Sequence, residues 1–438
     1  MSDARIFGSG REFVPQARRE GSVRVTEEDR EVLRRLAARK AETGGLAIQG
    51  TRRDLWTRMN RLERVKPLVW INEIPWHEMD VNDELTLRTT DPFLQGIEAG
   101  LRRELYQWEH MQGDMIVEPV VYSPLAINDT GFGIQEDVEI VRTDPRSGVV
   151  SRHFHIQIKD EDDAGKIKMP VVTHDRQLSD ERFHALSHIF DGVIPVEKRG
   201  VAGRWFAPWD ELIRLTGVQE AMTDLALRPG YIHTVMERLI AAYLCRLDQF
   251  EEQRLLSLNN SNVRVGSGGY GCSDEMPGPD FDPEHVRPRD MWGCGTAQIF
   301  SDVSPDMHWE FALQYELRSM ERFALSYYGC CEPLHTKLGI LKRVQNLRKI
   351  SMSPWADIDK ARANGAEDYV FSIKPNPAIL AEDDWHPERA EAELRAQIEK
   401  ARGCAVEVIL KDISTVRYQP KRLWEWARMA AEVTERYG

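Results

Sequence analysis

The chain has 438 residues, 42% of them hydrophobic and 29% charged, and its 58 basic and 71 acidic side chains give a formal charge of −13. An acidic balance of this size argues against nucleic acid or an anionic membrane as the main partner, because both bind concentrated positive charge, and no apolar run approaches the length of a membrane span. Six cysteines, in a chain whose first residues form no apolar leader, indicate a cytoplasmic protein with reduced thiols rather than a disulfide framework.

Helical and strand-like patterns alternate along the chain. Apolar residues that recur every three or four positions predict helices, and short apolar runs bounded by turn residues predict strands. The predicted strands are residues 67–71, 115–122, 192–196, 255–260, 324–328, 347–352, 369–377 and 406–410, and the main predicted helices are residues 53–65, 91–110, 179–190, 211–225, 231–254, 305–323, 391–402 and 422–436. This alternation predicts an α/β fold, a (β/α)8 TIM barrel. A doubly wound open sheet is the alternative, but no phosphate-binding glycine fingerprint follows the first strand.

Two parts of the chain depart from this alternation, and we expect the barrel itself to comprise residues 66–438. Residues 1–65 are predicted to be an N-terminal arm and a helical extension. Thr26 is the predicted N-cap of a helix in that extension, because acidic residues and an apolar helical pattern follow it. Residues 137–160 alternate apolar and polar side chains on both sides of the turn-forming residues 144–148. This pattern predicts an inserted β-hairpin that covers either the site or a surface for a partner.

The loop after the predicted strand 324–328 has the densest group of reactive side chains, namely Cys330, Cys331, Glu332 and His335. Thiolate and imidazole are ligands that zinc prefers, and at the start of a helix His335 would lie near the face of Cys331 and Glu332. A bound metal would lower the pKa of a substrate thiol and generate a nucleophile for methyl transfer. Two alternatives remain. The thiols could react without a metal, or one cysteine could be a small core residue while the other caps the loop.

Carboxylates and imidazoles near the ends of other strands are candidates for acid–base catalysis. Glu73 and His77 follow the first predicted strand, and Glu118 interrupts the second. Asp274 follows the glycine-rich segment 266–271, which permits close backbone approach to a ligand but lacks the Lys-Ser/Thr of a P-loop. The competing interpretation is that these are solvated residues paired with arginines.

The late strands end in residues that are candidates for substrate binding. Lys374 and Asn376 end one strand, Lys411 and Asp412 end the last, and Trp355 lies in a neighbouring loop. The lysines could bind a carboxylate or phosphate group of the substrate. They could equally form a salt-bridge network with the carboxylates around the top of the barrel.

Several segments, taken in order, carry a resemblance to a known family. They are Phe206–Gly217, Leu227–His233, Ser301–Pro305 with the helix that follows, Ser326–Cys331 and Ile373–Pro377. This ordered set resembles the uroporphyrinogen decarboxylase superfamily, which also contains methylcobamide-dependent methyltransferases and relatives of cobalamin-independent methionine synthase. In the methyltransferases, the segment that Ser326–Cys331 resembles holds a His-x-Cys zinc motif.

The resemblance implies a homodimeric barrel that moves a methyl group between a small substrate and a corrinoid carrier protein, with zinc at Cys330. The chain departs from the family pattern at Tyr328, which stands in the place of the zinc-binding histidine, and it has no cysteine in residues 412–418, where the later ligand would fall. Asp274 stands near the place of the decarboxylase's substrate-binding aspartate. We therefore expect a metal-dependent methyltransferase. The alternatives are a metal-free decarboxylase or lyase that acts on a small carboxylated substrate, and a non-catalytic barrel that docks a carrier protein.

Overall fold

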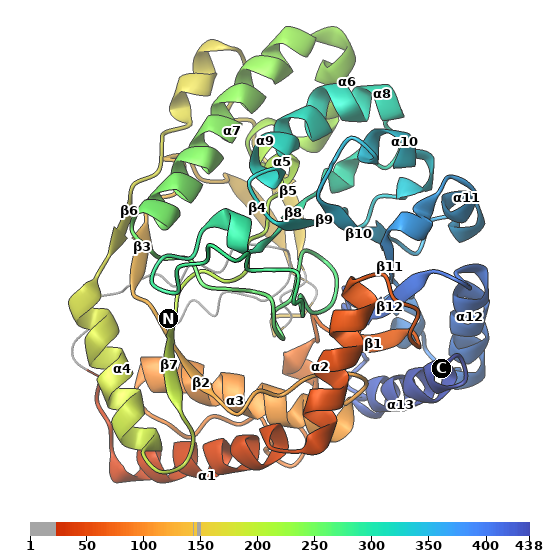
Figure 1. Ribbon diagram of the computed structural model, residues 1–438. Coiled ribbons are helices and arrows are strands. Elements are labelled where there is room, and N and C mark those ends of the chain that lie inside the picture. Colours follow the sequence, from red (N-terminus) through yellow and green to blue (C-terminus); the bar gives the residue numbers. More distant parts are fainter. Residues whose placement is uncertain (1–22, 143, 147–149) are drawn as a thin grey trace.

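The computed structural model describes residues 23–142, 144–146 and 150–438, and the polar arm predicted up to about residue 22 lies outside them. Figure 1 shows the strands gathered around the centre of the molecule and most of the helices outside them. None of the described helices is long and apolar enough to cross a membrane.

Parallel strands form the wall of the fold. In spatial order, the six-stranded sheet consists of β1 (Leu68–Ile71), β12 (Ala405–Leu410), β11 (Val370–Ile373), β10 (Leu347–Met352), β9 (Leu325–Tyr328) and β8 (Trp292–Gly295). A separate parallel pair joins β2 (Val121–Pro124) to β7 (Val196–Arg199). The first strand of the chain pairs with the last, as a closed wall requires. This arrangement confirms the predicted α/β barrel class.

Helices and short antiparallel pairs surround this wall. The helices are α1 (Glu27–Gly44), α2 (Ala47–Asn60), α3 (Pro92–His110), α4 (Arg176–Phe190), α5 (Pro208–Thr216), α6 (Val218–Leu227), α7 (Pro229–Glu252), α8 (Pro305–His308), α9 (Gln314–Met320), α10 (Leu338–Leu341), α11 (Ile358–Ala363), α12 (Pro387–Lys400) and α13 (Lys421–Glu435). The segment η5 (Trp309–Leu313) is a π-helix, and the 3-10 segments are η1 (Trp76–Glu78), η2 (Asp162–Lys166), η3 (Pro288–Asp290), η4 (Gln298–Phe300), η6 (Leu334–Thr336), η7 (Ala366–Asp368) and η8 (Pro377–Ala381). The antiparallel pairs are β3 (Ile127–Asp129) with β6 (Val172–His174) and β4 (Val138–Val141) with β5 (Ser151–Phe154).

The N-terminal extension packs on the outside of the barrel. Thr26 caps α1 as predicted, because its side chain accepts the backbone N–H of Asp29 while the Asp29 carboxylate accepts the backbone N–H of Thr26. The apolar face of α1, which includes Leu33 and Leu36, shares one buried cluster with residues of α3 and α4. The boundary at residue 65 between extension and barrel stays a prediction.

The sequence misplaced several element boundaries. The predicted helix 211–225 is two helices, α5 and α6, because Gly217 between them has φ +81°. The predicted strand 192–196 begins only after Pro195, which has no N–H to donate to a ladder. The predicted strand 255–260 is reduced to one parallel bridge between Leu256 and Val201. Further along, the side-chain amide of Asn259 bonds to the backbone N–H and C=O of Trp292.

The glycine-rich segment 266–271 lies inside the barrel, among the green loops near the centre of Figure 1. The backbone N–H of Gly269 donates to Glu407 at 3.0 Å. A Cβ added at Gly268 would lie 2.5 Å from a Glu407 oxygen and 2.6 Å from the Tyr327 ring. The sequence predicted close approach to a ligand, but the close neighbours are the barrel's own side chains. The segment is therefore an interior plug, which we call the glycine plug.

The inserted hairpin is confirmed as the β4–β5 pair. Tyr418, in the loop after β12, donates its hydroxyl to Asp144 in the hairpin turn, and the Arg146 guanidinium lies 4.3 Å from the centre of the Tyr418 ring. The hairpin therefore reaches the rim formed by the carboxyl ends of the parallel strands, which we call the barrel mouth.

Candidate active site at the barrel mouth

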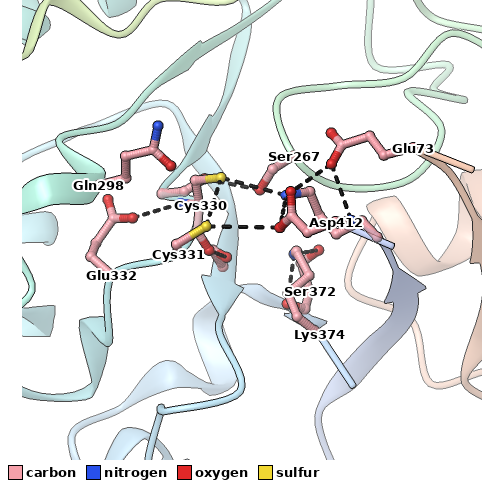
Figure 2. Close-up of polar contacts among 12 residues, drawn as sticks. Glu73, Ser267, Gln298, Cys330, Cys331, Glu332, Ser372, Lys374 and Asp412 are labelled. Atoms are coloured by element: carbon pink, nitrogen blue, oxygen red, sulfur yellow. Dashed lines mark hydrogen bonds and ion pairs between the residues drawn. The ribbon is translucent and has the colours of Figure 1, made fainter. Parts of the chain in front are cut away.

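The barrel mouth collects reactive side chains from three strands of the sheet. Cys330 and Cys331 follow β9, Lys411 and Asp412 follow β12, and Glu73 follows β1 (Figure 2). Parallel strands end at one edge of a barrel, so loops that are far apart in sequence meet there. For example, the backbone N–H of Asp412 donates to Glu73 at 3.2 Å.

The surroundings of Cys330 favour its thiolate. The Cys330 Sγ lies 3.6 Å from the Sγ of Cys331 and 3.7 Å from the Nζ of Lys411. The hydrogen bond from Cys331, followed by the charge of Lys411, lowers the pKa of Cys330 although burial opposes ionisation. Cys330 is therefore the more nucleophilic sulfur of the pair.

Cys331 is exposed and keeps its proton. Its hydrogen bond to Cys330 raises its pKa. The Cys331 Sγ also lies 3.8 Å from the Oδ2 of Asp412, so its S–H has two acceptors within reach. Burial raises the pKa of the Asp412 carboxyl, and the adjacent Lys411 only partly offsets this effect. The thiol pair therefore carries one proton, on Cys331, and one negative charge, on Cys330.

The remaining charges of the mouth are paired. Glu73 accepts from the Arg264 guanidinium at 2.7 Å and lies 3.3 Å from the Lys411 Nζ. Burial disfavours the ionised carboxyl, but Arg264 and Lys411 hold the pKa of Glu73 well below its usual range. Burial likewise disfavours the charged form of Lys411, and the negative groups Cys330, Glu73 and Asp412 hold its pKa well above the usual range. Each of these buried groups is therefore kept in its ionised form by the opposite charges next to it.

A second polar layer lies below the mouth, inside the barrel. Lys374 is 3% exposed, and its Nζ donates to the Tyr327 hydroxyl at 2.8 Å and to Ser372 at 2.6 Å. Burial lowers the pKa of Lys374 to about 7. Lys349 and Glu407 form an ion pair at 2.8 Å, and both side chains are completely buried. Hydrogen bonds and an ion pair between side chains of β9 to β12 therefore order the interior of the barrel.

Two of the four predicted zinc ligands contact other groups. Glu332 is fully buried and accepts the backbone N–H of Cys330 at 2.8 Å and the Thr296 hydroxyl at 2.9 Å. The Nδ1 of His335 accepts the backbone N–H of Asp357 at 3.2 Å. In the part of the chain that the structure describes, no three His, Cys, Asp or Glu side chains are grouped so that they could hold a metal ion. The predicted ligands do not fit a common zinc site in this arrangement, and Glu332 instead anchors the backbone of the thiol loop.

Of the predicted acid–base residues, Glu73 lies in the site and His77 lies at its margin. The His77 Nε2 is 3.5 Å from Glu78, and its ring faces Tyr418 with 6.2 Å between ring centres. Glu78 accepts three hydrogen bonds from residues 415–418 and so holds the loop after β12 in place. No contact between His77 and the thiol pair is found among the described residues.

Glu118 and Asp274 lie at the opposite end of the barrel from the thiols. Glu118 precedes β2, whose ladder begins only at Val121 rather than at the predicted residue 115. Asp274 pairs with Arg61, just after α2, and the residue after it pairs with Arg348 near the start of β10. Both carboxylates are therefore near the amino ends of strands, so the structure does not bring them to Cys330.

The predicted substrate-binding residues are divided in the same way. Lys374, Lys411 and Asp412 reach the mouth or the layer below it. Asn376 instead caps η8 by accepting the backbone N–H of Ala378 at 3.0 Å. Trp355 follows β10 and is 70% exposed, so its indole is open to solvent.

Sequence reasoning missed Arg264, Lys349, Tyr327 and Glu407. A signal was present for Glu407, because it is the single charged residue of the otherwise apolar strand β12 and a buried charge needs a partner. Lys349 gave a weaker signal, because it stands beside Arg348 in β10. Arg264 gave no such signal, because it lies in an irregular loop and meets Glu73 only through the tertiary fold.

A second buried cluster lies next to β9 and is formed by His308, Tyr328 and Glu316. The Tyr328 hydroxyl lies 2.7 Å from the Nε2 of His308 and 2.6 Å from the Oε2 of Glu316. Burial raises the pKa of Glu316 to about 8 and lowers that of His308 to about 3. Both groups are therefore neutral at neutral pH.

The π-helix η5 explains how one hydroxyl meets both of these residues. Positions seven apart in an α-helix share a face, because each residue advances about 100°. His308 and Glu316 are eight apart, and the wide turn of η5 between them absorbs the extra residue.

A cleft of about 880 Å³ lies elsewhere on the described part of the chain. It is lined by residues of α2, the C-terminal end of α3 and α13, and it includes Trp108 and Trp424. None of the mouth residues lines it. We assign the candidate chemistry to the mouth because the interacting nucleophile, acid and cations are found there.

No family model and no curated protein matches the sequence. Among solved structures, a methyltransferase from Methanosarcina mazei is similar in shape, with 11% identity, coverage of 88% of this chain and 98% of that chain, and a TM-score of 0.47. At these values the likeness carries no argument about function. Membership of the uroporphyrinogen decarboxylase superfamily stays a prediction.

Proposed function

We propose that the chain is a methyltransferase in which the Cys330 thiolate accepts a methyl group from a small substrate. The observation that carries this proposal is the placement of the Cys330 Sγ between the Cys331 thiol and the Lys411 ammonium at the barrel mouth. A thiolate is a soft nucleophile suited to attack on saturated carbon.

The transfer is a single displacement. A bond forms between the Cys330 sulfur and the methyl carbon while the bond from that carbon to the donor breaks, and the donor departs with the electron pair. Lys411, which donates toward Cys330 and Asp412, is placed to stabilise the thiolate before it attacks the methyl carbon. Glu332 keeps the thiol loop in place through the backbone N–H of Cys330.

The proposed transfer uses no metal, and the corrinoid carrier is retained only as a predicted methyl donor. The four predicted zinc ligands do not meet, so no step is assigned to zinc. A corrinoid on a partner protein as methyl donor follows from the family resemblance and stays a prediction, as does a homodimer.

The test is to incubate the purified protein with methylcobalamin, and separately with iodomethane, and to locate added methyl groups by peptide mass spectrometry. We expect a methyl group on Cys330 at neutral pH, and slower labelling in Lys411→Met. Cys404→Ser is the matched control, because Cys404 is a partly buried thiol whose pKa is raised by burial. Failure of both donors to label Cys330 in folded protein would contradict the proposal.

Lys374 supports a second candidate, the metal-free decarboxylase or lyase. In the described part of the chain no carboxylate pairs with Lys374, and with a pKa of about 7 it is partly neutral at neutral pH. A neutral lysine can form a Schiff base with a keto acid. Borohydride trapping of a pyruvate adduct on Lys374, absent in Lys374→Met, would favour this candidate. A protein that binds a corrinoid carrier but traps neither group would favour the non-catalytic docking role.

A further inference from the structure

We propose that Cys330 and Cys331 form a dithiol site that reduces a small disulfide and closes to a reversible vicinal disulfide. Their Sγ atoms are 3.6 Å apart, with the Lys411 Nζ 3.7 Å from one sulfur and the Asp412 Oδ2 3.8 Å from the other. The proposal rests on the same nucleophile as the proposed function, but it requires neither a methyl donor nor a metal.

The reaction balances in two steps. The Cys330 thiolate attacks one sulfur of the substrate RS–SR, which forms a mixed disulfide and releases RS⁻. Cys331 then gives its proton to Asp412 and attacks the Cys330 sulfur, which closes the Cys330–Cys331 bond and releases the second RS⁻. The substrate gains two electrons and the cysteine pair loses them. One leaving thiolate takes the proton held by Asp412, and the other takes a proton from solvent.

The mouth supplies a separate group for each step. Lys411 stabilises the charge on Cys330 before the first attack. Asp412 lies beside the Cys331 sulfur, where it can accept the proton that must leave before the second attack. Because its pKa is raised, this carboxyl is a stronger base than an ordinary aspartate.

Covalent geometry makes the closed form easy to reopen. The Cα atoms of adjacent residues are about 3.8 Å apart across a trans peptide, whereas disulfides usually join Cα atoms about 4.4 to 6.8 Å apart. A bond between neighbouring cysteines is therefore strained, and strained disulfides are the labile and catalytic ones. Reopening the bond requires two electrons, which a small dithiol reductant can supply.

The limited exposure of the Cys330 sulfur restricts the size of the disulfide that can react with it. Cys331 is exposed, but Cys330 is only 6% exposed, and the nearby hairpin turn reaches the loop after β12. A low-molecular-mass disulfide can reach the Cys330 sulfur, whereas a folded protein disulfide would meet the rim of the mouth. The substrate class is therefore a small organic disulfide.

The test uses 2-hydroxyethyl disulfide and the full chain, with products followed by intact and peptide mass spectrometry. The wild type should lose two hydrogens, gain no adduct and release two thiols, and dithiothreitol should restore it. Cys331→Ser should stop at a stable mixed disulfide on Cys330. Cys330→Ser should react at least about tenfold more slowly, because the remaining thiol is protonated.

Two results would overturn the proposal. One is a wild-type protein that accumulates a stable adduct on Cys330, and the other is equal reactivity of Cys330→Ser and Cys331→Ser. Cys404→Ser controls for a thiol elsewhere, and circular dichroism of each variant controls for folding. Methyl labelling of Cys330 without ring closure would leave the proposed function intact and reject only this inference.

Discussion

Tyr327 and Tyr328 are neighbours on β9, yet they belong to two buried polar clusters that are stabilised in different ways. Tyr327 faces the barrel interior, where Lys374 donates to its hydroxyl and the nearby ions Lys349 and Glu407 compensate each other. Tyr328 faces the helices outside, where its hydroxyl meets His308 and Glu316. The inner cluster buries charge by pairing it, and the outer cluster buries titratable groups by keeping them neutral.

This difference suits the two clusters to different chemistry. At the mouth above the inner cluster, the hydrogen bond from Cys331 and the charge of Lys411 favour the thiolate of Cys330. Neutral groups create little field, but they hold a proton where ordinary carboxylates have lost theirs. The mouth therefore provides a nucleophile, while the cluster behind β9 stores a proton.

The largest effect is expected from breaking the inner ion pair. Glu407→Leu would leave the Lys349 ammonium buried without its partner and should lower the free energy of unfolding by about 3–5 kcal/mol. Urea denaturation of the variant measures the loss. The double variant Lys349→Met/Glu407→Leu is the matched control, since removing both charges should recover most of the stability. A double variant no more stable than the single one would show that pairing is not what the residues contribute.

The pH dependence of stability distinguishes the outer cluster. The pKa of Glu316 is about 8 in the folded chain and near its usual 4.5 when the chain is unfolded. Between these values the unfolded carboxyl is ionised while the folded one keeps its proton, so rising pH should lower stability by at most about 1.4 kcal/mol per pH unit. The stabilisation is full below pH 4.5 and lost as pH rises through about 8. Glu316→Gln cannot titrate.

Urea unfolding at a series of pH values should therefore show a difference between Glu316→Gln and the wild type that changes over this window. His308 contributes in the opposite direction at lower pH. Its folded pKa of about 3 means that stability is lost as pH falls below its usual value of 6.5. Parallel curves for the two proteins would mean that Glu316 is ionised in the folded chain.

The smallest effect is expected on the reactivity of a single thiol. Lys411→Met removes the ammonium beside Cys330, so iodoacetamide labelling of Cys330 at neutral pH should slow by about tenfold, because less of the thiol is ionised. Lys421→Met, an exposed position at the start of α13, is the control and should leave the rate unchanged. An unaltered rate in Lys411→Met would assign the reactivity of Cys330 to Cys331 alone.

The barrel class could be predicted from the sequence, but only part of the candidate site could. Strand 347–352 was predicted to the residue, because its apolar residues Leu347, Ile350 and Met352 form a short run that Ser353 and Pro354 end. Glu73, Lys411 and Cys330 were also found, since all three follow predicted strands. Local patterns do not encode which side of a loop a residue faces, and this limit explains why Glu332 was read as a metal ligand.

Asp274 and Arg264 illustrate the same limit. Both lie in the long irregular stretch between α7 and β8, where spacing gives no register. The stretch carries Arg264 to Glu73 at the mouth and Asp274 to Arg61 at the other end. Only the three-dimensional course of the glycine plug separates the two.

The wide turn η5 also makes the outer cluster sensitive to chain length rather than to chemistry. Deleting one residue from Trp309–Leu313 would change no member of the cluster, yet it would turn the preceding helix by about 100° relative to the following one and separate His308 from Glu316. In evolutionary terms, a single inserted codon within a helix is enough to create or abolish a buried proton-binding pair. In proteins whose helix lacks this residue, an acid at the position of Glu316 would no longer meet the histidine, so we expect it to be replaced freely.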